Sequence, residues 1–387
     1  MALDGETLGQ LLDMVERFVR ERLRPAEEQL AREDRIPADV LADMRELGLF
    51  GLSIPEAYGG LGLSMAEEIQ VAFRLGRTSP AFRSIIGTNN GIGAQGIIID
   101  GTDEQKERYL PRLASGEMIG SFCLTEPEAG SDAGSLKTQA RRDGSHYVIN
   151  GTKRFITNAP EAGLFTVFAR TDPASSDGAG VSAFLVEAGT PGISLGKPDT
   201  KMGQRGAHSC DVIFEDVRVP ADAIIGGPAC EGRGFKTAMK VLDRGRLHIS
   251  AICVGVAQRL IADSLAYAME RKQFGAPIAS FQLIQAMLAD MRAESYAAEC
   301  MVGETARRRD AGFDVTVDAA CAKMFASEMV GRVADKAVQI HGGAGYVADH
   351  GIERFYRDVR LFRIYEGTTQ IQQLVIARGM IREARAA

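Results

Sequence analysis

The hydrophobic period of this chain changes twice, and each change separates a helical part from a β part. From Leu8 to Leu30 apolar side chains recur at helical spacing, with Arg and Glu at the other positions. Near Gly120 short apolar runs begin, separated by turn-forming residues, and helical spacing returns after residue 230 in long segments. This order predicts a multidomain α+β fold with an N-terminal helical domain, a middle β domain and a C-terminal four-helix-bundle domain, over residues 1–120, 121–228 and 229–387.

The middle part contains the strongest hairpin signal of the chain. Asn150-Gly151 lies between the runs SHYVIN and TKRFIT, and Asn-Gly is a preferred pair for a two-residue β-turn. Three further apolar runs follow, and turn residues rather than helix-length segments separate them. Because parallel strands need long crossover connections, the sequence predicts an antiparallel sheet.

Composition excludes several classes of protein. The chain has 45 Lys and Arg against 51 Asp and Glu, a formal charge of -6, and no dense basic block, which argues against nucleic-acid binding. No uninterrupted apolar run approaches the ~20 residues that span a bilayer, and the opening segment is acidic where a targeting signal would be basic. The six cysteines form no C-x-x-C pair and the five histidines show no metal-ligand spacing. We therefore expect a cytoplasmic protein without a membrane segment, a disulfide framework or a metal site.

The segment GIGAQG at residues 91–96 fits the glycine pattern of dinucleotide-binding proteins, but its surroundings do not. It lies in the helical part, and EQKERYLPRLASGE stands where a second strand ending in an acid would have to follow. We interpret these glycines as a junction between helices, which disfavours a nicotinamide-binding Rossmann enzyme.

The segment CLTEPEAGSDAGS at residues 123–135 enters the β part. Its Pro, Gly and Ser residues interrupt regular structure and leave backbone N–H and hydroxyl groups free to bind an anion or the polar edge of a ring. A surface turn would look similar, so this segment alone leaves both interpretations open.

Five motifs in a fixed order indicate a family. They are IPEAYGGLG, TEPEAGSD, INGTKRFITNA, RKQFGAPI and a tail that ends in Tyr365-Glu366-Gly367-Thr368. With these motifs in register the chain resembles the acyl-CoA dehydrogenase family over essentially its whole length. The resemblance implies FAD between the β domain and the C-terminal bundle, an acyl-CoA substrate against the flavin, electron transfer to an electron-transfer flavoprotein, and a homo-oligomer that we expect to be a tetramer.

The resemblance assigns FAD contacts to several segments. The first lies along the flavin and its ribityl chain and supplies Phe122, Leu124, Thr125, Gly130 and Ser131. The second supplies Phe155, Ile156 and Thr157, whose hydroxyl is expected near flavin N5. Residues expected to reach the pyrophosphate and adenine of a neighbouring subunit are Arg271, Gln273, Phe274, Gln339, Gly342 and Gly343. Gln282 is also expected to contact FAD. Thr368 and Gln370 complete the set.

Glu366 matches the catalytic base of the family. The resemblance implies that it removes the α-proton of the thioester while the β-hydrogen passes as hydride to flavin N5. Because that proton is weakly acidic, the base needs a raised pKa, and burial against an acyl chain and a flavin provides one. The Glu366 N–H and a ribityl hydroxyl are the expected donors to the thioester oxygen. Residues expected to contact substrate are Ser131, Asp243, Arg246 and Gly367; Arg246 could equally be a structural ion-pair residue.

Three positions depart from patterns common in the family. Some relatives carry the base just before an Arg of a segment like LDRGR, but here that position is Gly245, so Glu366 is the only base the motif supplies. Phe155 stands where many relatives have Trp, which predicts a smaller aromatic wall over the flavin. Glu128 replaces a common Gly, and the sequence offers no reason for it.

Two alternatives remain beside an FAD-dependent acyl-CoA dehydrogenase of acyl-CoA catabolism. One is an oxygen-using flavin oxidase or monooxygenase of the same fold. The presence of Glu366 disfavours the monooxygenases. Oxidases of this fold are usually longer, with an extra C-terminal domain, so the length of this chain disfavours them. The other is a non-catalytic helical scaffold, which would have no use for a buried unpaired carboxylate. The sequence does not predict the length or branching of the acyl chain.

Overall fold

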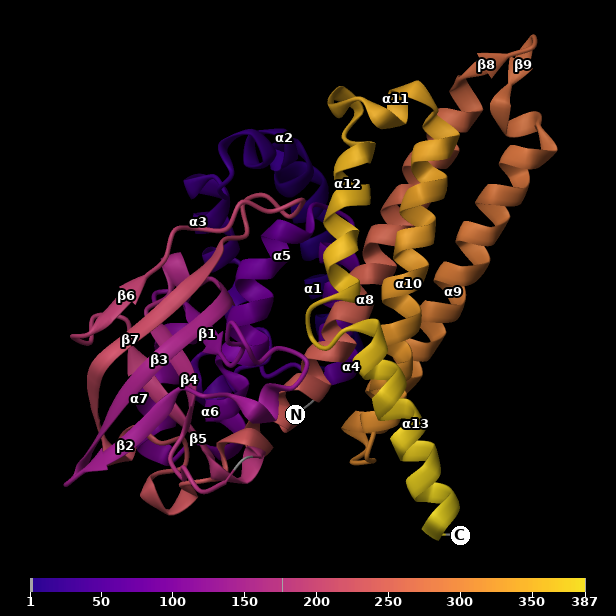
Figure 1. Cartoon of the computed structure of the whole chain (residues 1–387). Coiled ribbons are helices and arrows are strands. Elements are labelled where there is room, and N and C mark those ends of the chain that lie inside the picture. Colours follow the sequence, from indigo (N-terminus) through magenta and orange to yellow (C-terminus); the bar gives the residue numbers. More distant parts are fainter. Residues whose placement is uncertain (1–2, 176, 387) are drawn as a thin grey trace.

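The N-terminal part of the protein is helical, as expected. A computed structural model describes residues 3–175 and 177–386 (Figure 1). Thr102 caps α7 in a capping box with Gln105, which confirms the predicted helix start. The helices are α1 (Gly5–Phe18), α2 (Arg24–Glu33), α3 (Ala38–Glu46), α4 (Met65–Leu75), α5 (Pro80–Gly87), α6 (Gln95–Asp100) and α7 (Asp103–Ala114), with π-helical turns at Val19–Leu23 and Thr88–Gly93.

The predicted β part forms one seven-stranded sheet with the order β1-β4-β2-β3-β7-β6 and β5 on β4. The antiparallel expectation is confirmed for β2–β3, β3–β7, β4–β5 and β6–β7. It is wrong for β1 and β2, which both run parallel to β4. In both cases at least one strand intervenes in the sequence and provides the long connection that a parallel pair requires. The strands are β1 (Gly120–Cys123), β2 (Gln139–Asp143), β3 (His146–Thr157), β4 (Leu164–Arg170), β5 (Val181–Glu187), β6 (Ile193–Leu195) and β7 (Ser209–Pro220).

The Asn150-Gly151 hairpin prediction is also wrong, because both residues lie inside the continuous strand β3, at a register shift against β7. The Asn150 side chain is used across the strands: its Nδ2 donates to Asp216 Oδ1 at 3.0 Å and its Oδ1 accepts from Asp216 N at 2.8 Å. Gly151 has φ +152, and a Cβ there would lie 2.4 Å from Thr138 Oγ1. The pair therefore makes a bulge rather than a turn.

The GIGAQG segment is a junction between helices, as interpreted. It spans the end of the turn Thr88–Gly93 and the start of α6. Asn89 ties this junction to the first strand, because its Oδ1 accepts from Gly120 N at 2.8 Å and its Nδ2 donates to Leu113 O at 2.9 Å. Gly93 allows the close approach, since a Cβ there would lie 3.1 Å from Gly120 Cα. The glycines thus serve packing.

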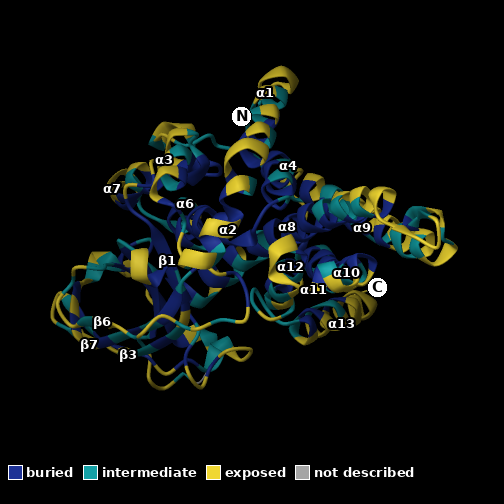
Figure 2. Ribbon diagram, turned by 90° about the horizontal axis from the view of Figure 1, so that it is seen from above, coloured by how far each residue is buried: buried dark blue, intermediate teal, exposed yellow. Residues whose placement is uncertain are grey.

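Long helices form the C-terminal part, and α8 is its central element (Figure 2). By length and composition α8 could cross a membrane, with a mean hydropathy of 1.4 in its most apolar window, but 61% of that window is buried against the rest of the protein. This is typical of a core helix. The elements are α8 (Gly234–Glu270), β8 (Lys272–Gln273), β9 (Ala276–Pro277), α9 (Gln282–Asp310), α10 (Thr316–His341), α11 (Gly343–Tyr346), α12 (Ile352–Val359) and α13 (Thr369–Ala386).

Candidate active site

A cavity of about 560 Å³ lies between loops of the β part, the first half of α8 and the turn before α13. Its apolar lining comes from all three parts of the chain, including Ile92, Phe235, Met239 and Leu242. The structure brings together around it eleven of the residues predicted from sequence: Phe122, Leu124, Thr125, Gly130, Ser131, Phe155, Ile156, Thr157, Arg246, Glu366 and Gly367.

A buried ion pair holds the loop that carries the first of these segments. Lys153 Nζ on β3 donates to Glu126 Oε1 at 2.8 Å and to Leu124 O at 3.2 Å, and both charged side chains are buried. Glu126 also accepts from the backbone N–H groups of Lys137 and Thr138 at 2.6 and 2.9 Å. Burial lowers the pKa of Lys153, whereas for Glu126 the effect of burial is outweighed by Lys153 and the hydrogen bonds, which lower its pKa. Sequence reasoning did not identify this pair.

The second segment places an aromatic ring at the rim of the cavity. Phe155 has φ +58 and is 58% exposed, and the guanidinium of Arg154 lies 4.9 Å from the centre of its ring. The neighbouring Thr157 accepts a hydrogen bond at its backbone oxygen from Ser121 Oγ at 2.6 Å. The unexplained acid Glu128 forms an exposed ion pair with Lys137, so its charge is compensated at the surface.

Glu366 projects into the cavity from a strained turn. Its φ is +56 and that of Gly367 is +85, both in the left-handed region. Glu366 Oε2 is buried and has no hydrogen-bond partner within the described part of the chain. Burial raises the pKa of this carboxyl, and the charges of Arg83, Arg246 and Lys323 act in the opposite direction. A buried acid with a raised pKa and a free oxygen is suited to accepting a proton.

Two side chains that sequence reasoning missed hold this turn. Lys323 Nζ on α10 donates to Gly367 O at 2.6 Å, and Gln372 Nε2 donates to Glu366 O and Gly367 O, both at 3.1 Å. The Lys323 side chain is fully buried, and burial lowers its pKa to about 8. The signal was a single Lys within the apolar run AACAKMFA of a helix.

Arg246 lies at the cavity and also forms an ion pair. It lines the cavity, and its Nη1 donates to Asp243 Oδ1 at 2.6 Å. Asp243 does not line the cavity and accepts a second hydrogen bond from Thr316 Oγ1 at 3.1 Å. Burial raises the pKa of Asp243, against the charge of Arg246. The pair therefore fixes the arginine at the cavity wall.

The remaining predicted residues lie elsewhere in the chain. Phe274 is 96% exposed in the β8–β9 hairpin, at the end of the bundle that also carries α11 (Figure 1). Tyr267 near the end of α8 stacks on His341 near the end of α10, with the ring centres 4.4 Å apart, so these two helix ends are adjacent. Thr368 Oγ1 accepts from Ile371 N at 3.2 Å at the start of α13. The predicted residues that do not line the cavity are Asp243, Arg271, Gln273, Phe274, Gln282, Gln339, Gly342, Gly343, Thr368 and Gln370.

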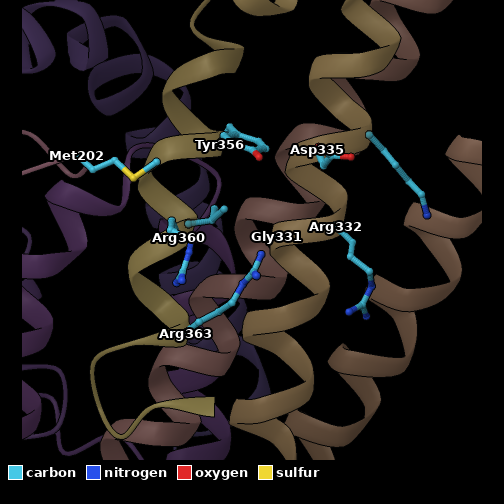
Figure 3. A pocket seen from close by; sticks show the side chains of 9 residues that line it. Met202, Gly331, Arg332, Asp335, Tyr356, Arg360 and Arg363 are labelled. Atoms are coloured by element: carbon cyan, nitrogen blue, oxygen red, sulfur yellow. The ribbon is translucent and has the colours of Figure 1, made fainter. Parts of the chain in front are cut away.

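A second cavity, of about 630 Å³, lies at α10 and α12 (Figure 3). Arg363 fills the space beside Gly331, where a Cβ would lie 2.0 Å from its Nη2. None of the residues predicted from sequence lines this cavity. Among the described residues no group of three or more His, Cys, Asp or Glu could hold a metal ion.

Comparison with known proteins identifies the family. The N-terminal, middle and C-terminal domains of acyl-CoA dehydrogenases match residues 5–117, 121–217 and 232–381. The chain belongs to the acyl-CoA dehydrogenase family. Members are FAD-dependent oxidoreductases that act on the CH–CH group of acyl-CoA, which confirms the enzyme class and the cofactor expected from the motifs.

Individual acyl-CoA dehydrogenases and their relatives match over nearly the whole length. The chain is 43% identical over 374 residues to the acryloyl-CoA reductase (NADH) of Anaerotignum propionicum, covering 96% of this chain and 94% of that protein. It is 41% identical to the human mitochondrial short-chain specific acyl-CoA dehydrogenase, covering 98% and 92%. The solved butyryl-CoA dehydrogenase of Megasphaera elsdenii superposes with a TM-score of 0.93 at 35% identity, covering 98% of this chain and 100% of that one.

The residues around the Glu366 cavity fit the FAD of an acyl-CoA dehydrogenase. Gly130 leaves open space in the first loop, because a Cβ there would meet no atom within 4 Å. Aromatic and apolar side chains line the cavity beside a few polar groups. Glu366 Oε2, which has no partner among the described residues, can accept a hydrogen bond or a proton from a ligand bound there. Phe122, Thr125, Ser131, Phe155 and Thr157 are the residues that would hold the flavin.

Proposed function

We propose that this protein catalyses the α,β-dehydrogenation of an acyl-CoA thioester to a trans-2-enoyl-CoA, with Glu366 as the base. The observation that carries the proposal is the buried Oε2 of Glu366, which has a raised pKa and no partner among the described residues. A buried unpaired carboxylate costs stability, so its presence in a cavity indicates a role toward a ligand.

Glu366 takes the α-proton onto its free oxygen, and the electron pair of that C–H bond enters the forming double bond. FAD held by Phe122, Thr125, Ser131, Phe155 and Thr157 would supply the two-electron oxidant for the β-hydrogen, which leaves as hydride, so that the substrate loses two electrons and two hydrogens in all. Gly367, with its left-handed backbone, allows the side chain to enter the cavity from the turn. Lys323 and Gln372 fix that turn, so the carboxylate is positioned before the substrate binds.

The backbone N–H of Glu366 is the proposed donor to the thioester oxygen. Within residues 3–175 and 177–386 this N–H makes no hydrogen bond. A free backbone donor at the base stabilises negative charge that develops on the thioester oxygen as the α-proton leaves. Arg246, held by Asp243, adds positive charge at the cavity wall.

The proposal extends to partners and location. Arg271, Gln273, Phe274, Gln282, Gln339, Gly342 and Gly343 lie at an end of the bundle and do not line the cavity of their own chain. This supports a homo-oligomer, proposed as a tetramer, in which they reach the FAD of a neighbouring subunit. An electron-transfer flavoprotein is the proposed acceptor, and the cytoplasm is the proposed location.

The test is an anaerobic visible spectrum of the FAD-loaded protein during titration with short, medium, long and branched acyl-CoA thioesters. Bleaching of the flavin band that recovers slowly in air and rapidly with an electron-transfer flavoprotein supports the proposal. Rapid recovery in air would instead favour an oxidase of the same fold. A protein that binds FAD but is bleached by no thioester would contradict the substrate class or the role of Glu366.

The direction of the reaction is tested in the same experiment. Because one relative is named a reductase, oxidised protein is mixed with the saturated thioester and dithionite-reduced protein with the matching enoyl-CoA, and the rates of flavin reduction and flavin reoxidation are compared. The base that removes the α-proton returns it in the reverse direction, so Glu366 serves both. Net dehydrogenation supports the proposal as stated.

A further inference from the structure

Arg83 on α5 is buried without a partner. It is 7% exposed, and among the described residues it forms no side-chain hydrogen bond and no ion pair. Its Nε is a buried atom with no hydrogen-bond partner. Arginine is almost never buried unless it is paired, because removing its charge from water is costly. The protein therefore retains a costly buried cation that no hydrogen bond or ion pair of the described residues compensates.

The other interior arginines near the site all have carboxylate partners. Arg244 pairs with Glu68, and Arg246 pairs with Asp243. Glu68 is fully engaged, because its other oxygen accepts from His248 Nδ1 at 2.8 Å. Glu366 is the nearby acid with a free oxygen, but it makes no ion pair with Arg83 among the described residues. We therefore expect the anion that pairs with Arg83 to come from outside the chain.

Arg83 lies on the helical run that leads into the cavity. That run continues from α5 into the turn Thr88–Gly93, whose Ile92 lines the cavity. The guanidinium lies over Gly87, where a Cβ would come 2.3 Å from its Nε, so this glycine makes room for it. Arg83 also acts on two cavity residues, Tyr365 and Glu366. Burial raises the pKa of both groups, and the positive charge of Arg83 opposes that rise.

The interior thus holds two unpaired groups of opposite character, the acid Glu366 and the cation Arg83, which do not bind each other. Given the proposed function, we propose that Arg83 binds a carboxylate at the far end of the acyl group, so that the substrate is the CoA monothioester of a short dicarboxylic acid. The thioester end lies at Glu366 and the carboxylate end at Arg83. The planar guanidinium offers parallel N–H donors that match the two oxygens of a carboxylate.

This assignment makes Arg83 a specificity residue. An uncharged acyl chain of the same length leaves the guanidinium buried and unpaired, whereas a terminal carboxylate satisfies it. The bound carboxylate also offsets the positive charge near Glu366, so the base becomes a stronger proton acceptor when the correct substrate is present.

The experiment compares thioesters matched in length with the FAD-loaded, full-length protein. The succinic, glutaric and adipic monothioesters of CoA are tested against butyryl-, valeryl- and hexanoyl-CoA, and kcat/KM for flavin reduction is measured for each. We expect at least one dicarboxylic thioester to exceed its uncharged partner by about 100-fold. If the uncharged thioesters are the better substrates, the inference is wrong.

Variants at position 83 assign the preference to the arginine. Arg83→Gln is expected to lower kcat/KM for the dicarboxylic thioester by about 100-fold or more, and to change kcat/KM for the uncharged thioester by a much smaller factor. Arg83→Lys keeps the positive charge but lacks the planar guanidinium. Its kcat/KM for the dicarboxylic thioester is expected to lie between those of the wild type and Arg83→Gln. The exposed Arg32→Gln on α2 is the control and should change neither. An equal loss with both kinds of thioester would overturn the role of Arg83.

The outcomes separate this inference from the proposed function. Bleaching by uncharged thioesters alone overturns the inference and supports the dehydrogenase. If no thioester of either kind bleaches the flavin, the proposed function fails and the inference with it. The wild-type comparison decides on the substrate class even if the Arg83→Gln variant fails to fold.

Discussion

Gly245 on α8 provides the space that the carboxylate of Glu366 occupies. A Cβ at Gly245 would lie 2.6 Å from Glu366 Oε2 and 3.0 Å from its Cδ. The family resemblance places the catalytic base of some members at the position of Gly245, and here that position and the side chain of Glu366 meet at one point of the cavity. The two positions are therefore alternatives in space, because a side chain at residue 245 would displace the one at residue 366.

Gly245→Ala tests this relationship. In a helix, Gly to Ala usually stabilises by up to about 1 kcal/mol, but here the added carbon displaces the carboxylate. A misplacement of about 1 Å costs roughly 100-fold in rate, so we expect flavin reduction by acyl-CoA to fall by about that factor while FAD remains bound. Gly303→Ala on α9 is the control, because the nearest atom to its Cβ would lie 3.7 Å away. Unchanged activity in Gly245→Ala would contradict the placement of Glu366.

Glu366→Gln removes the proton acceptor and keeps the size of the side chain. We expect normal FAD content and ligand binding, and flavin reduction slower by at least about 1,000-fold, since general-base catalysis contributes up to about 10,000-fold. The absorbance of the flavin band measures FAD content and ligand binding, and its change after rapid mixing with acyl-CoA measures the rate of flavin reduction. The exposed Glu128→Gln in the neighbouring loop controls for loss of negative charge. Substantial remaining turnover would remove Glu366 from the mechanism.

Lys323→Met tests the lysine that positions the base. The positive charge of Lys323 lowers the pKa of Glu366, so its removal raises that pKa further. Because the base acts when ionised, the rate of flavin reduction rises with pH through this pKa, and the rise is expected at higher pH in the variant. The rate on the plateau also falls, since Gly367 O loses the donor at 2.6 Å.

The pH profile separates positioning by Lys323 from a general loss of structure, which would lower the rate without moving the profile. Lys336→Met on the same helix is the control. Its Nζ pairs with Asp290 at 3.0 Å on the surface, away from the turn. An unshifted profile in Lys323→Met would show that the lysine only fills space.

Much of this architecture follows from short-range pattern. Helical periodicity predicted the first and last parts of the chain, and Thr102 predicted the start of α7, because capping depends on neighbouring residues alone. The order of the family motifs along the chain predicted eleven of the residues that line one cavity. What periodicity could not predict is the pairing of β1 with β4, since it depends on contacts between distant parts of the chain.

The wrong hairpin has a similar cause. Asn150-Gly151 is favoured in turns, yet here the Asn side chain binds Asp216 and the Gly lies against Thr138, both distant in sequence. The roles of Lys323 and Arg83 could not be predicted from the sequence for the same reason. Each is a single charged residue in an apolar run. Only the fold shows that Lys323 holds the turn of Glu366 and that Arg83 has no partner among the described residues.

Glu126→Ala tests the buried pair that holds the first flavin loop. Removing one partner leaves Lys153 buried and uncompensated, which costs about 3–5 kcal/mol. We expect the free energy of unfolding in urea to fall by that amount and FAD to bind more weakly, because the Lys137 and Thr138 N–H groups also lose their acceptor. The double variant Glu126→Ala with Lys153→Met removes the stranded charge and should recover part of the loss. A single variant as stable as wild type would contradict this role.

His208 links the β part to the end of α2 and predicts a pH-dependent contribution to stability. Its Nδ1 lies 2.5 Å from Glu161 Oε1 and its Nε2 lies 2.5 Å from Asp34 O, so both ring nitrogens face acceptors. Only the protonated ring donates from both nitrogens. The hydrogen bond to Glu161 is the main reason that the pKa of His208 is raised in the folded protein, against the effect of partial burial.

Glu161→Gln therefore weakens the protein at low pH only. A raised pKa stabilises the fold fully below the unfolded value of about 6.5, and the contribution disappears as the pH rises through the folded value. Because the pair is partly exposed, we expect a loss of up to about 1 kcal/mol near pH 5.5 and almost none near pH 8.5, measured by urea unfolding at both. The exposed Glu215→Gln on β7 is the control and should show no such difference. An equal loss at both pH values would mean that Glu161 acts through packing rather than through the charge of His208.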